Sequence, residues 1–299
     1  MRLISALRPV WAGLLLAAFI AVGLIVLNSF IPEQPLPLRP RHALFVSGLI
    51  VVLLVLIGTA PRTSPGAPAE LLAPVRGQWV AMNSPGQHLP SHGTRTRGQY
   101  CAVDLSRPAR DSTPALVRWG LRGDRPEEYP SFGEPVYAMA PLVVVVRSLG
   151  SRRDHRARST WPGLVYLATV EAMAREIGGT GAVLGNHVIV AHDDGTFAAY
   201  AHLRRGSAIA LGSSVVAGDV IGRVGNTGNT SMPHLHVQLM DRANVEAAAG
   251  LTMVWPQIAR TGDLDPTFVK YAREPTSAAL SQMPRDGEVF TAPETPPAA

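Results

Sequence analysis

Two long apolar segments near the N-terminus constrain the fold of this chain more than any other feature of its sequence. Residues 10–30 and residues 43–60 contain no Asp, Glu, Lys or Arg. Each segment is about long enough to cross a hydrocarbon layer of roughly 30 Å as a helix. Residues 31–42 between them contain four prolines, which lack the backbone N–H that a continuous helix needs. The sequence therefore predicts a two-helix transmembrane hairpin over residues 1–62.

A signal peptide followed by a buried core helix is the alternative interpretation of these segments. Residues 10–30 are not followed by a small-residue cleavage pattern, and residues 43–60 are themselves long enough to span a membrane. The stretch Gly58-Thr59-Ala60 offers the one plausible cleavage site and keeps this alternative open.

The rest of the chain divides into a linker, one domain and a tail. Residues 63–70 are rich in Pro, Gly, Ser and Ala, and we expect a flexible linker there. Residues 71–273 are long enough for one globular domain with its own core. Residues 274–299 contain five prolines and little apolar periodicity, which predicts a disordered tail.

The basic residues are almost all arginines, and they give the chain a net charge of +5. Arginine suits contacts with carboxylates and phosphates, such as those of a cell wall or an anionic membrane surface. The alternative explanation for the predominance of arginine is codon bias together with the ordinary need for solubility. Lys270 is the only lysine, and no basic stripe with interleaved aromatic residues occurs, so we expect no nucleic-acid partner. The single cysteine, Cys101, excludes an internal disulfide and is expected to be a small core residue.

The domain has mostly the sequence pattern of β-strands. Five short segments are rich in β-branched or alternating residues and are bounded by Gly, Asn, Asp or Pro: residues 136–146, 187–192, 196–203, 220–224 and 234–239. One segment differs, because Leu164, Leu167, Val170, Met173 and Ile177 recur at helical spacing. The pattern predicts an antiparallel β domain with one inserted amphipathic helix. Residues 106–132 and 147–160 are expected to be long surface loops.

The segment PHLHVQL, residues 233–239, is the first candidate for chemistry. On a strand, alternate side chains share a face, so His234, His236 and Gln238 point one way and the leucines and valine point to the core. Two imidazoles at this spacing lie roughly 7 Å apart, close enough to serve one metal centre.

A glycine-rich turn precedes the histidine strand. Its glycines follow the pattern G-x-x-G-x-x-G over residues 222–228 and lead into a strand. A dinucleotide-binding fingerprint would require G-x-G-x-x-G leading into a helix, so that interpretation fails.

Two further candidates lie on other predicted strands. His202 ends an alternating strand, where it is expected to share a face with Ala198 and Tyr200. Asp104 is expected to share a strand face with Tyr100, and Cys101 to face the other way.

Together these motifs resemble the catalytic domain of the lysostaphin-type (LytM-like) zinc metalloendopeptidases. The resemblance covers about residues 83–239, interrupted by the two loops and the helix. It rests on six segments: GEPVYA at 133–138, GNHVIV at 185–190, YAHL at 200–203, GDVIG at 218–222, GNTGN at 225–229 and PHLH at 233–236.

The resemblance implies a fold, an activity and a set of site residues. The fold is mainly β, an antiparallel sheet arranged as a barrel-sandwich hybrid (duplicated hybrid motif). The activity is zinc-dependent hydrolysis of peptide bonds in the stems or cross-links of peptidoglycan. By the same resemblance, Asp104 and His236 are zinc ligands, and His202 and His234 polarise the attacking water and steady the developing oxyanion.

The sequence departs from the family pattern at one position. The family places its first histidine four residues before the aspartate, where this chain has Tyr100. We expect His92, delivered by a loop that folds back over the site, to be the third ligand. His88, or a weakened site with two ligands, remains the alternative. His42, His155, His187 and His192 are expected to have no role in the site.

Three rival functions are weighed against a hydrolase. A non-catalytic relative of the same fold could bind peptidoglycan or activate another hydrolase. A biotin- or lipoate-carrier domain would resemble residues 215–222, but Lys270 lies outside any such hairpin. A structural membrane protein would leave the recurrence of histidines in three matching contexts unexplained.

The charges that flank the hairpin leave its orientation open. Arg2, Arg8 and Arg62 lie on one side and Arg39 and Arg41 on the other, which slightly favours a cytoplasmic C-terminus. A peptidoglycan substrate requires the opposite orientation. We therefore expect a cell-membrane protein with an extracytoplasmic catalytic domain.

Overall fold

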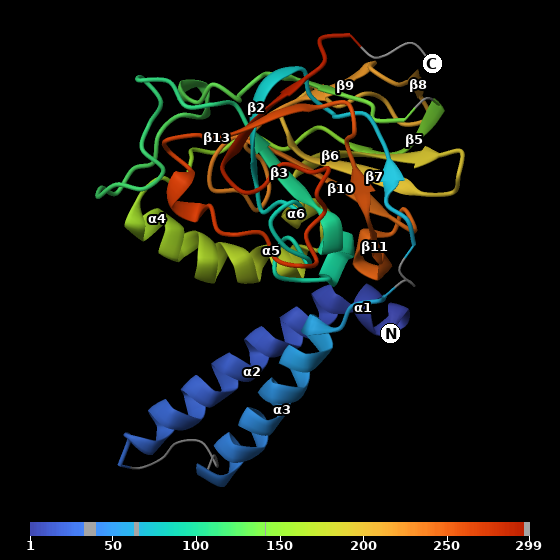
Figure 1. Cartoon of the computed structure of the whole chain (residues 1–299). Coiled ribbons are helices and arrows are strands. Elements are labelled where there is room, and N and C mark those ends of the chain that lie inside the picture. The colour runs from blue at the N-terminus through green and yellow to red at the C-terminus, as the bar shows by residue number, and fades with distance from the viewer. Residues whose placement is uncertain (33–39, 63–65, 141, 296–299) are drawn as a thin grey trace.

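The computed structural model describes residues 1–32, 40–62, 66–140 and 142–295, which form an N-terminal helical hairpin beneath a mainly β domain (Figure 1). The hairpin consists of a short helix and two long ones: α1 (Arg2–Ala6), α2 (Arg8–Ser29) and α3 (Pro40–Gly58). The predicted pair of helices is confirmed, although the proline-rich turn of residues 31–42 lies largely outside the described residues.

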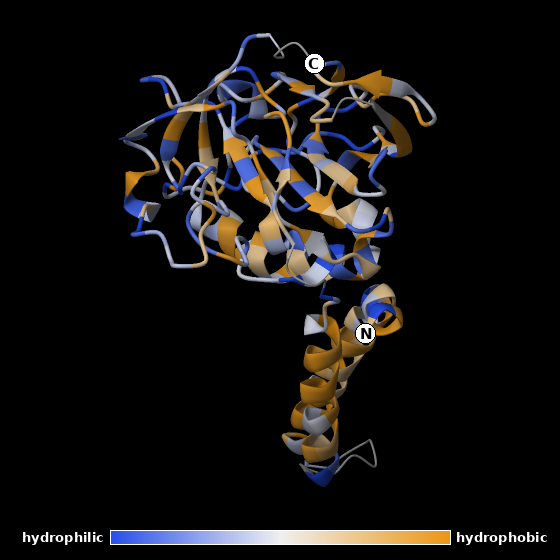
Figure 2. Ribbon diagram, turned by 45° about the vertical axis from the view of Figure 1, so that its right-hand side comes forward, coloured by the Kyte–Doolittle hydropathy of each residue, from blue (hydrophilic) through white to orange (hydrophobic). Residues whose placement is uncertain are grey.

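Figure 2 shows that the two long helices consist of hydrophobic residues along most of their length, and many of these side chains are exposed. Both are long and apolar enough to cross a membrane. Only 6% of the most apolar window of α3 is buried. A core helix of a soluble domain would be buried, so the exposure of α3 argues against the alternative of a signal peptide followed by a core helix.

A large antiparallel sheet forms the body of the domain. Its strands run in the order β13-β14-β2-β3-β10-β7-β6-β5-β8, and β11 pairs with β10 outside this path. Their bounds are β2 Gly77–Met82, β3 Val103–Ser106, β5 Leu142–Leu149, β6 Asn186–His192, β7 Phe197–Leu203, β8 Ser214–Val216, β10 Leu235–Met240, β11 Gly250–Leu251, β13 Ala259–Leu264 and β14 Glu288–Ala292.

Two small sheets complete the β structure. One pairs β4 (Pro135–Tyr137) with β9 (Val220–Arg223), and the other pairs β1 (Ala69–Glu70) with β12 (Met253–Val254). The predicted antiparallel β fold is confirmed. The segment predicted as one strand over residues 136–146 is divided between β4 and β5.

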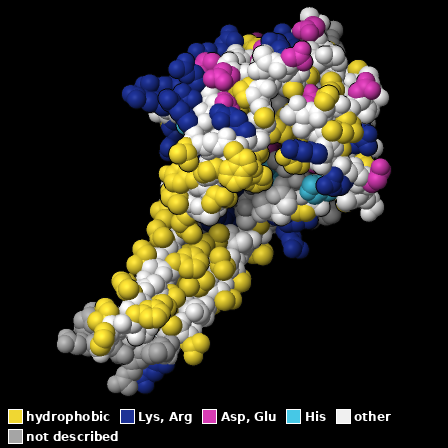
Figure 3. All heavy atoms as spheres, turned by 90° about the vertical axis from the view of Figure 1, so that its left-hand side faces the viewer, with side chains coloured by type: hydrophobic (Ala, Val, Ile, Leu, Met, Phe, Trp, Pro, Cys, Tyr) yellow, Lys and Arg dark blue, Asp and Glu magenta, His cyan; other side chains and the backbone are white. Residues whose placement is uncertain are grey.

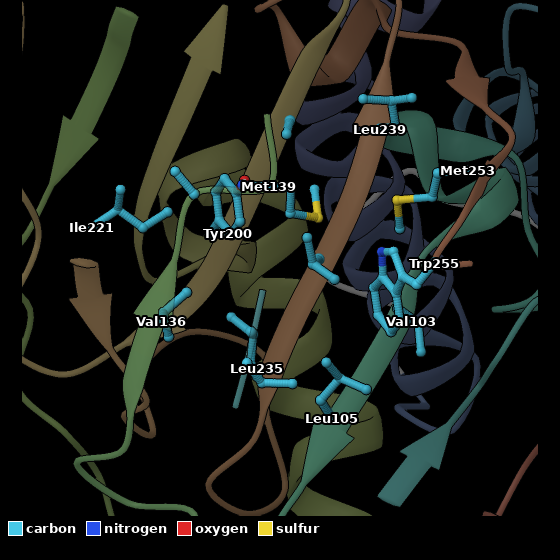
Figure 4. Packing of buried hydrophobic residues seen from close by; sticks show 14 of the residues in the cluster. Val103, Leu105, Val136, Met139, Tyr200, Ile221, Leu235, Leu239, Met253 and Trp255 are labelled. Atoms are coloured by element: carbon cyan, nitrogen blue, oxygen red, sulfur yellow. The ribbon is translucent and has the colours of Figure 1, made fainter. Parts of the chain in front are cut away.

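The main core lies between the large sheet and the β4–β9 pair. Val136 and Ile221 of the small sheet share one buried cluster with Tyr200, Leu235 and Leu105 of the large sheet (Figure 4). Cys101 belongs to the same cluster, as expected, and burial raises the pKa of its thiol to about 12. The alternation of side chains leaves the opposite face of β3, β7 and β10 available for polar groups.

The predicted helix is confirmed as an insertion between β5 and β6. It runs through α4 (Trp161–Tyr166), a π-helical segment (Leu167–Glu171) and α5 (Ala172–Gly178), and α6 (Thr180–Val183) follows. Four 3₁₀ segments occupy the loops: Thr96–Cys101, Pro126–Glu128, Val245–Ala247 and Val269–Tyr271. Thr160 caps the insertion by accepting a hydrogen bond from the backbone N–H of Gly163 (3.2 Å).

Two of the predicted segment boundaries are wrong. The tail expected to be disordered over residues 274–299 contributes β14, whose Phe290 is buried against the core and pairs with Trp79 of β2. The linker predicted over residues 63–70 ends earlier, because Ala69 and Glu70 pair with β12. In both places a short strand gains its stability from backbone pairing with the domain, which composition does not reveal.

Candidate metal centre

The site begins with two neighbouring strands of the large sheet. Asp104 of β3 lies directly opposite His236 of β10 in the antiparallel register. Leu235 and Val237 are buried in the main core, so His236 and Gln238 point to the other face, as the alternation predicts. Nδ1 of His236 lies 2.8 Å from Oδ1 of Asp104.

A loop between β2 and the Thr96–Cys101 segment brings His92 to the same carboxylate. The loop is fixed beside β3 because Ser91 donates from its backbone N–H to the Tyr100 carbonyl (3.0 Å) and from its hydroxyl to the Ala102 carbonyl (2.6 Å). Nε2 of His92 lies 3.2 Å from Oδ1 of Asp104. The side-chain ligand atoms of His92, Asp104 and His236 all lie within 4.8 Å of one another.

His202 and His234 complete the cluster. The His202 ring centroid lies 4.8 Å from that of His234 and 5.8 Å from that of His236. Nε2 of His234 lies 3.6 Å from Oδ1 of Asp104. The structure therefore gathers all five predicted site residues in one place.

The prediction that His202 shares a face with Ala198 and Tyr200 is wrong. Tyr200 is buried in the main core, whereas His202 faces the site. A β-bulge in the pairing of β6 with β7 places Ala201 and His202 opposite His187, and His202 takes a φ of 62°. The extra residue turns the His202 side chain to the face of His236.

His202 and His234 each donate a hydrogen bond to a backbone carbonyl. Nδ1 of His202 donates to the Thr227 carbonyl (2.8 Å), and Nδ1 of His234 donates to the Met232 carbonyl (2.8 Å). A carbonyl oxygen can only accept, so Nδ1 carries the hydrogen in each ring and Nε2 keeps a free lone pair. Burial is the main cause that lowers the pKa of both residues, for His202 well below 6.5. Both rings are therefore neutral bases at neutral pH.

The glycine-rich turn, which supplies the Thr227 carbonyl, makes a close backbone contact with the loop before β6. Gly228 has a φ of +81°, and a Cβ on it would lie 2.4 Å from the backbone nitrogen of Gly185. His155 supports the same turn, since its Nε2 lies 3.1 Å from the Gly228 carbonyl. The glycines are thus required by the approach of two loops.

Two polar residues around the cluster were not predicted as part of the site. Oε1 of Gln238 lies 2.9 Å from Nε2 of His236, and Nε2 of Gln238 donates to the Arg97 carbonyl (2.7 Å). Asn83 donates from Nδ2 to Oδ2 of Asp104 (2.8 Å), which leaves Oδ1 to the histidines. The position of Gln238 on the histidine face was the only signal in the sequence for either role.

The electrostatics of the cluster favour a bound cation. Burial alone would raise the pKa of Asp104, but electrostatic interaction with the imidazoles of His92 and His234 and the hydrogen bond from His236 hold it well below the ordinary value. Burial would likewise lower the pKa of His236, yet the bond and charge of Asp104 raise it. Both ring nitrogens of His236 face acceptor oxygens. Nε2 of His92 is buried and, although it lies 3.2 Å from Oδ1 of Asp104, it forms no hydrogen bond among the described residues. A metal ion bound by Nδ1 of His236, Oδ1 of Asp104 and Nε2 of His92 would satisfy all three atoms.

A cleft of about 220 Å³ opens beside the cluster. Its lining includes the polar residues Asp104 and His234 and the apolar residues Leu116, Leu164 and Tyr271. Leu116 comes from residues 106–132, which were predicted to form a surface loop. Leu164 comes from α4 of the helical insertion.

The remaining residues weighed from the sequence lie elsewhere. Tyr100 belongs to the 3₁₀ segment Thr96–Cys101, so the expected strand face shared with Asp104 is wrong. The guanidinium of Arg95 stacks on the Tyr100 ring at 3.9 Å. His88 is not in the ligand group found among the described residues. His187 and His192 have hydrogen-bond partners on their own strands or turns.

Comparison with known proteins identifies the region of the chain that carries the histidines. The profile of peptidase family M23 matches residues 130–247, which include His202, His234 and His236. The chain is 30% identical over 150 residues to the cell division protein DipM of Caulobacter vibrioides, and the match covers 50% of this chain. It covers 22% of DipM, so the chain spans about a fifth of that protein's length.

Two solved structures illustrate the matches at the level of coordinates. The catalytic domain of the antimicrobial peptidase lysostaphin from Staphylococcus simulans is 19% identical, with a TM-score of 0.28, over 48% of this chain and 88% of that one. A putative glycyl-glycine endopeptidase from Ruminococcus gnavus is 17% identical, with a TM-score of 0.27, over 50% of this chain and 42% of that one.

Proposed function

We propose that the chain, whose residues 130–247 match the model of peptidase family M23, is a zinc-dependent endopeptidase that hydrolyses peptide bonds in peptidoglycan stems or cross-links. The observation that carries this proposal is the convergence of three potential ligand atoms, from His92, Asp104 and His236, within 4.8 Å of one another. Two neutral imidazoles, of His202 and His234, lie beside them.

The ligand set suits a catalytic zinc site. Such sites use three protein ligands from His and carboxylate side chains and keep a fourth position open for water. Zinc lowers the pKa of a bound water to about 7, which supplies a hydroxide at neutral pH. Nδ1 of His236 and Nε2 of His92 are the ring nitrogens that face Asp104, so we assign them, with Oδ1 of Asp104, as the ligand atoms.

His202 and His234 are the candidates for proton transfer. Each keeps an unprotonated Nε2 because its Nδ1 donates to a backbone carbonyl. A neutral imidazole beside a reacting water accepts a proton, and the imidazolium then returns it to the leaving amine. Both residues are also positioned to donate to the developing oxyanion once they are protonated.

The cleft combines polar and apolar lining residues, as a binding site for a peptide requires. Leu116, Leu164 and Tyr271 belong to its apolar lining, and Asp104 and His234 to its polar lining. The loop segments 106–132 and 147–160 contain many arginines, and arginine suits contacts with the carboxylates of peptidoglycan stems. The match to peptidase family M23 and the resemblance to the lysostaphin-type peptidases favour peptidoglycan as the source of that peptide.

We place this activity at the cell membrane, outside the cytoplasm. The helices α2 and α3 are the anchor, and peptidoglycan lies on the outer side of the membrane that they would cross. A reporter fused after Ala299 tests the orientation. A cytoplasmic reporter would overturn both the orientation and the substrate.

Metal content and wall digestion test the activity itself. The purified full-length chain is compared with His92→Ala, His236→Ala and the matched control His88→Ala. We expect one zinc per wild-type chain, loss of zinc and activity in the first two variants, and neither loss in the control. Loss in His236→Ala and His88→Ala but not in His92→Ala would move the third ligand to His88. A wild-type chain without zinc and without activity would instead identify a wall-binding or regulatory relative.

A further inference from the structure

The inserted helix exposes four large apolar or aromatic side chains that a helix on a soluble protein would bury. Trp161 (50% exposed), Val165 (60%), Tyr166 (49%) and Val170 (57%) of the insertion are turned away from the domain. In a soluble protein, the apolar stripe of a surface helix faces the core and its charged residues face water.

The charged residues of the insertion face the domain instead. Glu171 pairs with Arg158 at 2.7 Å, and Arg175 donates to Oδ1 of Asn229 in the glycine-rich turn (3.1 Å). Glu176 pairs with Arg97 beside the metal centre at 2.6 Å. These contacts fix the rotation of the helix about its axis, so the exposure of its apolar side is set by the fold.

The exposed apolar side lies next to the two helices of the hairpin. Met173 of α5 packs against the cluster formed by Leu15, Ala18 and Leu53 of α2 and α3. Figure 3 shows an apolar patch at the base of the domain that continues into the apolar surface of the hairpin. In Figure 1, α4 and α5 run across the base of the domain, at the level where α2 begins.

Ion pairs hold this arrangement at the junction of hairpin and domain. Arg8, at the start of α2, is buried and pairs with Glu246 at 2.6 Å. Arg2 pairs with Asp241 at 2.6 Å. The first turn of α2 is therefore held against the domain, and the insertion beside it is held at the depth where the hairpin would enter the bilayer.

We propose that the insertion of residues 161–178 is a second membrane-binding element, which lies in the lipid interface with its apolar side toward the acyl chains. This inference rests on the anchor in the proposed function. Trp and Tyr, both present on the exposed side, are the residues enriched at membrane–water interfaces. Helices of this kind bury their apolar side about 5–10 Å into the boundary between headgroups and acyl chains. Met173 packs against the cluster that contains Leu15 and Ala18, which lie about 10 to 15 Å along α2 from its start at 1.5 Å per residue, so the insertion lies beside the first turns of the hairpin.

The proposal assigns a position to the catalytic cleft. Leu164 belongs both to the insertion and to the wall of the cleft that contains Asp104 and His234. If the insertion lies in the interface, the cleft is held beside the membrane surface and accepts peptides close to it.

Fluorescence quenching in the full-length chain tests the proposal. The chain is reconstituted in vesicles of zwitterionic and anionic lipids, and an environment-sensitive fluorophore is attached to Val170→Cys. Cys101 is buried, so the unmodified chain serves as the labelling blank. Val52→Cys, on the exposed side of α3, is the positive control. Leu211→Cys is the control for a label that stays in water. Leu211 is 67% exposed in the turn before β8, and Figure 1 shows β8 at the end of the domain away from the hairpin.

Nitroxide lipids, labelled near the headgroup end of the acyl chain, distinguish the outcomes. We expect Val170→Cys to be quenched several-fold more than Leu211→Cys and to emit at shorter wavelength. Quenching of Val170→Cys no greater than that of Leu211→Cys, with Val52→Cys quenched, would refute the interfacial helix and leave the anchor intact. Absence of quenching at Val52→Cys would refute both the anchor and the interfacial helix, while the proposed zinc site would stand on its own test.

Discussion

Gln238 gives the sharpest test of how this site binds a metal ion. Its Oε1 accepts a hydrogen bond from Nε2 of His236 (2.9 Å), and its own amide is held by the Arg97 carbonyl (2.7 Å). This arrangement keeps the hydrogen of His236 on Nε2 and leaves Nδ1 for the metal. Gln238→Met keeps the size of the side chain and removes this acceptor.

The expected cost follows from the tautomers of His236. Without the acceptor, the metal-free ring takes the hydrogen on Nδ1, where Oδ1 of Asp104 accepts it (2.8 Å). Metal binding then requires a buried Nε2–H with no partner, which costs about 1–3 kcal/mol. Since about 1.4 kcal/mol corresponds to a tenfold change, zinc affinity should fall by about 5- to 150-fold. Mutation of a residue that hydrogen-bonds a metal ligand typically lowers metal affinity or activity by about 10- to 100-fold.

Zinc affinity is measured by competition with a chelator in the full-length chain. Gln238→Glu retains an acceptor oxygen and should bind zinc more tightly than Gln238→Met. Gln87→Met is the matched control, because Gln87 is also buried but donates to the carbonyls of Arg273 and Glu274. Wild-type affinity in Gln238→Met, or an equal loss in Gln87→Met, would refute the tautomer argument.

Three further predictions concern the pH dependence, the bases and the glycine-rich turn. Because the pKa of His236 is raised above 6.5, protons compete with the metal near neutrality, so zinc affinity should fall as the pH is lowered from about 8 to 6; chelator competition that found no change would contradict this. His202→Gln and His234→Gln should each lower kcat by about 10²- to 10⁴-fold in wall digestion while zinc content stays at the wild-type level, and zinc loss would instead make them ligands. Gly228→Ala should lower the free energy of unfolding by about 1–3 kcal/mol in a denaturant titration, since its Cβ would meet the backbone of Gly185; unchanged stability would show that the turn can move.

The strands of the catalytic face could be predicted because their physics is local. A strand with one buried face alternates apolar and polar residues, so PHLHVQL fixes the direction of His236 without knowledge of its neighbours. The pairing of β10 with β3 brings Asp104 to His236, and it could be predicted only from the resemblance to a family. The sequence of one strand does not determine its register with a strand that is distant in the chain.

His202 and His92 mark the limit of such local reasoning. His202 reaches the site only because a bulge against β6 interrupts the alternation, and the extra residue is defined by the partner strand. His92 reaches the site through two hydrogen bonds of Ser91 to a segment that follows it in the chain. β14 was missed for a related reason, because this five-residue strand depends on its pairing with β2 on one side and β13 on the other.

The inserted helix was predicted from its period, but the period does not say which environment its apolar side meets. Val170 belongs to the expected apolar stripe and is 57% exposed, while Glu171 beside it is paired inside the domain. Periodicity reports a difference between two sides of a helix, and contacts alone decide which side is outward.

The buried charges at the base of the domain explain how the hairpin can keep a fixed orientation relative to the metal centre. Apolar contacts between α2 and α5 would be nearly as favourable with lipid acyl chains, so they select no single orientation. Arg8 and Glu246 have no equivalent partners in lipid, and removal of one partner from a buried ion pair costs about 3–5 kcal/mol. Glu246 also binds Arg97 at 3.0 Å, and the Arg97 carbonyl holds Gln238 against His236. The residues that orient the domain on its anchor therefore also orient a proposed zinc ligand. A change in how the hairpin packs on the domain would then change the orientation of His236.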